Sequence, residues 1–212
     1  MVKEGCLNDI DEVYGYHNIP NFDEGDIRVC EGPFFAARHT CKITITGQGG
    51  HGSAPHKIRD PITAAAMVHT ALNSIKARNI DSRRNIVFTI CTINAGHTYN
   101  VFPDSAEMTG SIRSYDNETL EKMMERIKSI SENVAAGFLC KADVHFDMED
   151  CYPAVINHVE PTKHVIRLAK AHIGEEHFSQ EELPLSASED FSYFLMEKPG
   201  CFFALGTMKE GK

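Results

Sequence analysis

The sequence predicts an α/β protein into which a smaller α+β domain, ferredoxin-like in type, is inserted. Between residues 41 and 148 the hydrophobic periodicity changes in the order strand, helix, strand, strand, helix, strand, which is the split β-α-β arrangement. A short strand candidate precedes this stretch, and the apolar run CFFALG after it is typical of a strand buried on both faces. We therefore expect residues 1–38 and 151–212 to form parts of one α/β domain, interrupted by residues 39–150.

The inserted domain is expected to begin with a strand over residues 41–46, where apolar and polar side chains alternate. A helix is expected over residues 61–78, because Asp60 and Pro61 suit the N-cap and the first helical position and apolar residues then recur at helical spacing. The glycine-rich stretch GQGGHGSAPH, residues 47–56, connects the two elements.

The second half of the inserted domain repeats this pattern. Residues 85–93 are apolar and β-branched, and residues 105–114 alternate, so both are expected to be strands. Asn117 offers a cap to a long amphipathic helix, and residues 141–148 alternate again. These elements complete the expected domain.

The outer segments are expected to supply fewer elements. The strand candidate EVYGY leads into a turn at residues 17–20, and a helix is expected between Pro161 and Gly174. A short helix, SEDFSYFL, follows with Ser188 as its expected N-cap. An α/β layer with so few strands and helices leaves its sheet edges uncovered, so we expect part of a larger protein.

Composition excludes several classes of partner. The 21 basic and 30 acidic side chains give a formal charge of -9, which repels a nucleic-acid backbone, and no aromatic RNP pattern marks the strands. No run approaches the roughly twenty apolar residues of a membrane span. The seven scattered cysteines lack a C-x-x-C pair, which favours reduced thiols and a cytoplasmic location.

His17 is the first candidate metal ligand, because it follows a predicted strand at the place where α/β folds hold ligands and metals. The alternative is a polar histidine in a turn. One imidazole cannot hold a metal ion, and the remaining histidines show no H-E-x-x-H spacing. Any metal site formed by this chain alone is therefore expected to be incomplete.

Three hypotheses compete for GQGGHGSAPH. A phosphate-binding loop would need Lys-Ser or Lys-Thr after the last glycine and an immediate helix, and the sequence has neither. A purely structural connection is the second. The third is a loop whose glycines carry His51 into a neighbouring site. The sequence alone leaves the last two open.

Two more residues are candidates for substrate contacts. Asn100 lies in the connection between two expected strands, and Arg113 lies near the end of the second, where its guanidinium could bind a carboxylate. A turn asparagine and a solvated arginine are the alternatives. Glu189 and Asp190 are expected in the first turn of a helix, where they complement its dipole.

Several strings together carry a family resemblance: VYGYHNIP, GPFFAA, KITITGQGGHGSAPHKIRDPITAAAMV, AGHTYNVFPDSAEMTGSIRS, SEDFSYFL and PGCFFALG. In order and spacing they resemble the metal-dependent amidohydrolases of the aminoacylase, hippurate hydrolase and indole-acetyl-amino-acid hydrolase group. The resemblance covers nearly the whole chain. It implies an α/β catalytic domain with two divalent ions, zinc or manganese, interrupted by a ferredoxin-like lid that forms a homodimer.

The resemblance also implies roles for the candidate residues. His17 matches a metal ligand, and His51 matches a lid histidine that enters the partner subunit's active site and polarises the scissile carbonyl. Asn100 and Arg113 match positions that contact the amide and the carboxylate of a small N-acyl-amino-acid substrate. The loop is then rich in glycine because it passes between subunits.

Other parts of the family's site have no counterpart in this sequence. The H-x-D segment, the first-half metal ligands and the Glu-Glu pair that supplies the general base would precede Met1, and a further histidine ligand would follow Lys212. By resemblance, the chain is a fragment that we expect to be nearly inactive alone. The alternative hypothesis is a non-catalytic dimerisation or interaction module derived from such an enzyme.

Overall fold

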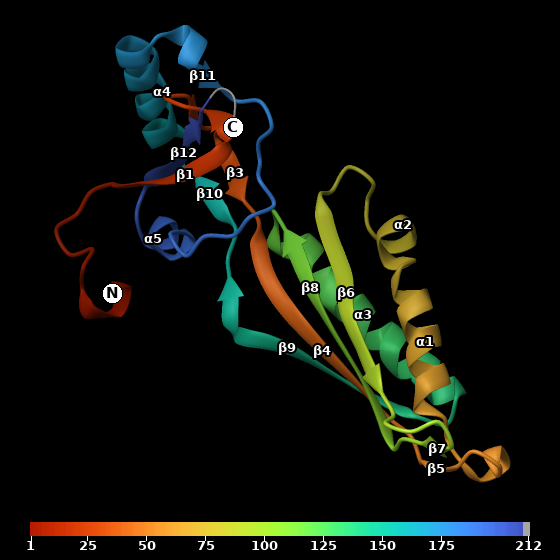
Figure 1. Ribbon diagram of the computed structural model, residues 1–212. Helices are drawn as coiled ribbons and strands as arrows, with labels where there is room; N and C mark the ends of the chain where they lie inside the picture. Colours follow the sequence, from red (N-terminus) through yellow and green to blue (C-terminus); the bar gives the residue numbers. More distant parts are fainter. Residues whose placement is uncertain (210–212) are drawn as a thin grey trace. The chain divides into compact units, whose positions relative to one another are not determined.

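The computed structural model describes residues 1–209, apart from the side chains of residues 148–150, and shows a mixed α/β protein (Figure 1). The predicted α/β class is confirmed. The chain divides into two compact units, one formed by Met1–Ala37 with Tyr152–Lys212 and the other by Arg38–Cys151. Each unit is described separately below, the second unit first.

A four-stranded sheet forms the frame of the Arg38–Cys151 unit. Its strands are β4 (Ala37–Thr46), β6 (Ile86–Ala95), β8 (Ser105–Ser114) and β9 (Lys141–Tyr152). They lie in the order β6-β8-β4-β9, with β6 antiparallel to β8. Because buried and more exposed residues alternate along β4 and β8, one face of the sheet packs against the core.

Helices cover that face of the sheet (Figure 1). They are α1 (Pro61–Leu72), α2 (Ile75–Asn79) and α3 (Asn117–Gly137), and α1 packs against both α3 and β8. The fully buried side chains of this layer include Met123 and Ile127 from α3 and Ile43 and Ile45 from β4. The unit therefore has its own hydrophobic core.

Helix α1 begins where its sequence predicts, whereas α3 is capped one residue earlier than expected. Asp60 accepts a hydrogen bond of 2.9 Å from the Ile62 N–H, and Pro61 occupies the first helical position. At the start of α3, Asp116 accepts from the Thr119 N–H at 2.8 Å. Asp116 is therefore the N-cap, and Asn117 is already helical.

The single helix expected over residues 61–78 is broken after Leu72. The Asn73 side-chain amide donates to the His69 carbonyl at 2.9 Å, and the Ser74 hydroxyl donates to the Ala71 carbonyl at 2.7 Å. Such side chains compete with backbone amides for the helical carbonyls. The chain turns at this point and continues as the short helix α2.

The other unit is built on a second four-stranded sheet. Its strands are β1 (Val13–Asp23), β12 (Gly200–Met208), β2 (Ile27–Arg28) and β11 (Phe178–Ser179), in the order β1-β12-β2-β11. The long strands β1 and β12 run parallel, with Val13 opposite Gly200. The strands β3 (Gly32–Phe35) and β10 (Val155–Asn157) form a separate antiparallel pair in this unit, and β10 contacts β12.

Strand β1 is longer than expected and includes the segment that the sequence places in a turn. His17, Asn18 and Ile19 each pair with a residue of β12, so His17 lies within the strand rather than after it. The regular register ends at Ile19, next to Pro20, which has no N–H to donate. Pairing with a strand far away in the sequence therefore extends β1 beyond its local signal.

Helices α4 (Val159–Ile173) and α5 (Ser192–Glu197) complete this unit, and α4 packs on β12. Its core is largely aromatic and aliphatic: Leu7, Val13, Phe22, Phe34, Phe35, Val155, Leu195, Phe202 and Ala204. Helix α5 begins at Ser192, not directly after Ser188, so Glu189 and Asp190 precede the helix instead of forming its first turn.

One buried side chain joins separate parts of this unit by hydrogen bonds. Asn157 is 3% exposed, and its amide donates to the carbonyls of Cys30 at 3.0 Å and Phe202 at 2.8 Å. Its side-chain oxygen accepts from the Phe202 N–H at 2.7 Å. Because a buried amide side chain requires hydrogen-bond partners, these bonds fix the start of β12 against the chain before β3.

The remaining short elements are the 3₁₀ turns Val2–Glu4, Pro55–Lys57 and Glu175–His177 and the strands β5 (Gly50–His51) and β7 (Val101–Phe102). Across residues 1–209, the length and apolar character that a helix needs to span a membrane are not found together in any helix.

Candidate functional site

The short strands β5 and β7, which are not consecutive in the chain, form a two-stranded pair that brings two of the candidate residues together. This pair is called the β5–β7 hairpin below. Strands β5 and β7 pair antiparallel, with His51 opposite Val101, and the Gly52 N–H donates to the Asn100 carbonyl at 2.8 Å. His51 and Asn100 are far apart in the sequence, yet their backbones are neighbours across this hairpin. Backbone pairing therefore holds the two residues close together.

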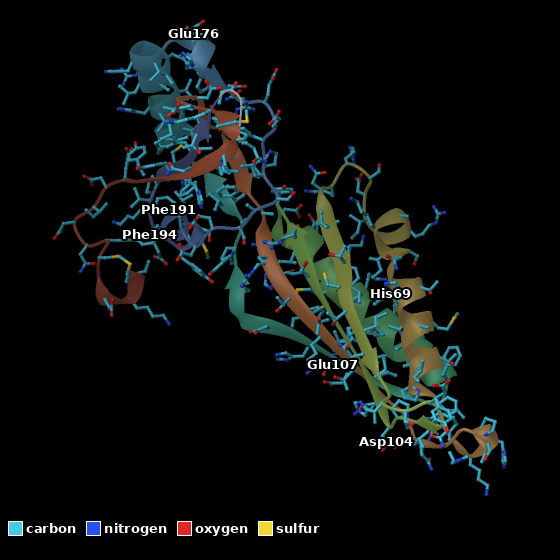
Figure 2. The ribbon with its side chains drawn as sticks, viewed as in Figure 1. His69, Asp104, Glu107, Glu176, Phe191 and Phe194 are labelled. Atoms are coloured by element: carbon cyan, nitrogen blue, oxygen red, sulfur yellow. The ribbon has the colours of Figure 1, made fainter. Side chains whose placement is uncertain are left out.

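The glycine-rich loop is held in place by Asp104. The Asp104 carboxylate accepts a hydrogen bond from the Gly49 N–H at 2.8 Å, and its carbonyl accepts from the Gly47 N–H at 2.8 Å. Figure 2 shows Asp104 at the end of the unit where β5 and β7 lie. No local sequence pattern marks Asp104, because its partners are so distant in the sequence.

A second set of hydrogen bonds fixes the other side of the loop. Gln48 and Arg59 form an antiparallel bridge in which each N–H donates to the other's carbonyl, at 2.9 and 3.0 Å. The Arg59 guanidinium also donates to the Gln48 side-chain oxygen at 3.0 Å. The backbone that leads to His51 is therefore anchored on both sides.

The glycines of this loop are required by close backbone contacts within the unit. A Cβ atom on Gly47 would lie 2.1 Å from the Arg59 carbonyl oxygen, and one on Gly49 would lie 2.4 Å from the Phe102 carbonyl oxygen. Both distances are far shorter than a van der Waals contact. The steric requirement for glycine at these positions therefore arises within one chain, whatever else the loop approaches.

The His51 imidazole is exposed and makes two contacts with Ser53. Its Nδ1 atom lies 2.7 Å from the Ser53 hydroxyl oxygen, and the Ser53 N–H donates to the same atom at 3.2 Å. The contact is local, since Ser53 follows His51 by two residues.

The Asn100 side chain is also exposed, and its carbonyl oxygen accepts a hydrogen bond from the Thr98 hydroxyl at 3.3 Å. That assignment directs the amide oxygen toward the local turn, and the side-chain NH₂ group is the end that donates. Asn100 thus supplies a second hydrogen-bond donor on the same hairpin as His51.

Arg113 lies far from this hairpin within the unit. It is paired with Val87 near the end of β8, whereas the hairpin adjoins the start of that strand (Figure 1). The strand rises about 3.3 Å per residue, so Arg113 is roughly 26 Å from Ser105. Burial, together with the like charge of Arg38, lowers the pKa of the Arg113 guanidinium, which indicates that the two arginines are close.

His17 is exposed on β1, opposite Ala204 of β12. Its Nδ1 atom lies 2.8 Å from the Asn18 carbonyl oxygen. Because a carbonyl oxygen can only accept, Nδ1 carries the hydrogen in the neutral ring and Nε2 retains its lone pair. This is the form in which an imidazole binds a metal ion.

Glu189 lies close enough to His17 for the histidine to influence its carboxyl group electrostatically. Burial and the neighbouring Asp190 raise the pKa of the Glu189 carboxyl, and His17 acts in the opposite direction. The sequence predicts that Glu189 and Asp190 complement a helix dipole, but the helix begins after them. The proximity of Glu189 to His17 is the more informative feature.

One suitable histidine does not make a complete metal site. Among the residues that the structure describes, no three His, Cys, Asp or Glu side chains are grouped so that they could hold a metal ion. Three or four ligands are the usual requirement. The described residues therefore do not form a metal site by themselves, and His17 can contribute one ligand at most.

The chain is similar to known proteins in sequence and in fold. Residues 38–138 match the family described as "Peptidase dimerisation domain". The chain is 36% identical, over its full length, to thermostable carboxypeptidase 2 of Saccharolobus solfataricus and covers 53% of that protein. Over 96% of its length it is 34% identical to the hippurate hydrolase of Campylobacter jejuni, again covering 53%.

A solved structure is similar throughout the described fold. It is a dinuclear metal-binding peptidase of the M20 family from Bacillus subtilis, 28% identical with a TM-score of 0.79. The likeness covers 97% of this chain and 51% of that one. The chain thus spans about half the length of the relatives that it matches.

The fold and the match over residues 38–138 define the class of this unit, a peptidase dimerisation domain. Over nearly its whole length, the chain is similar to hydrolases that include a hippurate hydrolase and a dinuclear metal-binding peptidase of the M20 family.

Proposed function

We propose that the protein acts in the metal-dependent hydrolysis of the amide bond of N-acyl-amino acids. The observation that carries the proposal is the hairpin that places His51 beside Asn100, two hydrogen-bonding side chains on a fixed backbone. Relatives whose names state such activities, including a hippurate hydrolase and an N-acetylcysteine deacetylase, support the substrate class. We place the reaction in the cytoplasm, in keeping with seven scattered cysteines that include no C-x-x-C pair.

Each candidate residue has a role that its chemistry supports. His17, with Nε2 unprotonated, would hold one of two divalent ions, zinc or manganese, which supply Lewis acidity and an activated water. His51 donates a hydrogen bond to the oxygen of the scissile carbonyl as negative charge develops on it. Asn100 binds the substrate amide, and the Arg113 guanidinium binds the α-carboxylate.

A small substrate cannot contact both His51 and Arg113 of one copy. Arg113 is roughly 26 Å along β8 from the start of that strand, at about 3.3 Å per residue, which exceeds the length of an N-acyl-amino acid. We therefore propose that a homodimer forms each site, with His51 and Asn100 supplied by one subunit and Arg113 by its partner. The match to a dimerisation domain supports this arrangement.

Strand β6 is the edge through which we expect the dimer to form. It is an outer strand of its sheet, and residues 86–95, IVFTICTINA, contain no charged side chain. The other edge, β9, carries Lys141 and Asp143, and charges of this kind protect an edge from pairing. Ile93 of β6 is 49% exposed.

Introduction of a charge on this edge is expected to weaken the dimer. Ile93→Lys should raise the dimer dissociation constant at least about ten-fold, because two copies then face each other with like charges. Sedimentation velocity over a concentration series measures the constant. Val159→Lys, at a residue of similar exposure on α4, is the matched control. A wild-type monomer, or an unchanged constant in Ile93→Lys, contradicts this assembly.

Hydrolysis itself is tested with protein expressed from its complete coding sequence and supplied with zinc or manganese. We expect release of the amino acid from N-acetylcysteine or hippurate, and loss of that activity on metal removal by a chelator. The 212-residue chain alone is expected to be nearly inactive with the same metals, since its described residues hold no complete ligand set. A dimer that binds no metal and hydrolyses none of these substrates would instead identify a non-catalytic dimerisation module.

A further inference from the structure

The contacts of His51 determine which of its ring nitrogens carries the hydrogen. The Ser53 N–H donates to Nδ1 across 3.2 Å, and an amide N–H cannot accept a hydrogen bond. Nδ1 is therefore the acceptor. In the neutral imidazole, the hydrogen then lies on Nε2.

The Ser53 hydroxyl acts in the same direction. Its oxygen lies 2.7 Å from Nδ1, and because Nδ1 is the acceptor, the hydroxyl is the donor. A turn holds both groups in place, since the Ala54 N–H donates to the His51 carbonyl at 2.9 Å. One residue thus directs two donors at the same ring atom.

The backbone on either side of the ring is equally fixed. Gly50 and His51 pair with β7, and the Gly52 N–H donates to the Asn100 carbonyl at 2.8 Å. The peptide groups that place Ser53 next to the ring are therefore set by the hairpin. The ring nitrogen that faces Ser53 is defined by the fold.

We propose that Ser53 is a positioning residue that fixes His51 as its Nε2–H tautomer, so that the outer end of the ring presents a hydrogen-bond donor. This inference rests on the proposed function of His51 and deepens it. The imidazole acts on the substrate carbonyl oxygen as a neutral donor and not as a base. In the other tautomer, Nε2 would present a lone pair and repel the developing negative charge.

The position of the donor is tested by two replacements of His51 in the protein made from its complete coding sequence. The glutamine amide reaches the position of Nε2, whereas the asparagine amide reaches only that of Nδ1. His51→Gln should therefore retain about ten-fold more kcat than His51→Asn. Equal loss in both variants overturns a donor at Nε2. Full activity in His51→Ala overturns the proposed function of His51. It does not test the tautomer, which NMR measures independently.

The tautomer is measured on the 212-residue chain by NMR of its ¹⁵N-labelled histidine rings, at a pH where the rings are neutral. The His51 signals are those lost in His51→Gln, and the Gly47 and Gly49 amide signals verify that the hairpin is intact. We expect an unprotonated Nδ1 in the wild type. Ser53→Ala should lower the ratio of Nε2–H to Nδ1–H about five-fold, the ratio to which one hydrogen bond of about 1 kcal/mol corresponds.

Two further variants complete the test. Ser53→Thr keeps the hydroxyl and should keep the wild-type ratio, and Ser82→Ala, an exposed serine before β6, should leave it unchanged. A protonated Nδ1 in the wild type overturns the inference. An unchanged ratio in Ser53→Ala, or a ratio in Ser53→Thr as low as that of Ser53→Ala, does the same.

Discussion

Replacement of His51 by alanine is expected to lower kcat by about 10²- to 10³-fold in the protein made from its complete coding sequence, with KM nearly unchanged. The reason is that a donor directed at the carbonyl oxygen binds the negative charge of the transition state more strongly than the neutral substrate. The Nε2–H group is at the exposed end of a ring whose other nitrogen is occupied by Ser53. Steady-state kinetics with N-acetylcysteine or hippurate measures the change.

A matched histidine separates this effect from a general loss of structure. His69→Ala alters a histidine on α1, away from the β5–β7 hairpin (Figure 2), and should leave kcat within about two-fold of the wild type, as most substitutions away from a site do. If His51→Ala retained wild-type kcat, or if His69→Ala lost as much activity, His51 would have no specific role in catalysis. Mixing His51→Ala protein with an Arg113→Ala variant adds a test of the shared site, because a mixed dimer contains one site with both residues intact.

Gly47→Ala is expected to destabilise the fold by about 3 kcal/mol, at the upper end of the range for overpacking. The added Cβ would lie 2.1 Å from the Arg59 carbonyl oxygen, a backbone atom that is itself held by the bridge to Gln48. No side-chain rotation can relieve this contact, so the loop or the bridge must move. Urea unfolding of the 212-residue chain, followed by circular dichroism, measures the change in the free energy of unfolding.

Gly137→Ala provides the control for the same chemical change. Gly137 ends α3, and a Cβ atom there would meet nothing within 4 Å. Alanine favours the helix over glycine, so this variant should be neutral or more stable by up to about 1 kcal/mol. Equal stabilities for Gly47→Ala and Gly137→Ala would show that the loop accommodates a side chain at residue 47. The close contact with the Arg59 carbonyl oxygen would then not explain why glycine occurs there.

Much of the fold could be predicted because it depends on local signals. Asp60 and Pro61 mark the start of α1, and Gly174 adopts a φ of 91° directly after α4. The alternation along β4 also matches its buried residues. Caps, turns and periodicity act over a few residues, so one sequence contains the information that sets them.

The errors arose where distant or competing interactions decide the outcome. Strand β1 extends through His17 because β12 pairs with it, and the helix after Pro61 breaks where Asn73 and Ser74 bond to helical carbonyls. Ser188 resembles an N-cap in sequence, but α5 begins only at Ser192. Propensity alone could not rank these alternatives.

The candidate site also combines features with a local sequence signal and features that depend on long-range pairing. His51 could be singled out because glycines surround it, but its proximity to Asn100 depends on the pairing of β5 with β7. Asp104, which fixes the loop, has no sequence signal because its partners are more than fifty residues away. The separation of Arg113 from the hairpin follows from the length of β8, which becomes informative only when the strand is placed in its sheet.

The chain passes into the Arg38–Cys151 unit along β4 and leaves it along β9, and these two strands are neighbours in one sheet. The unit is one contiguous segment with its own core. It can therefore be replaced by the corresponding segment of a related protein with only two new junctions in the chain, one at β4 and one at β9. Grafting residues 38–151 between related hydrolases is therefore expected to transfer the proposed dimer interface and the His51 loop together.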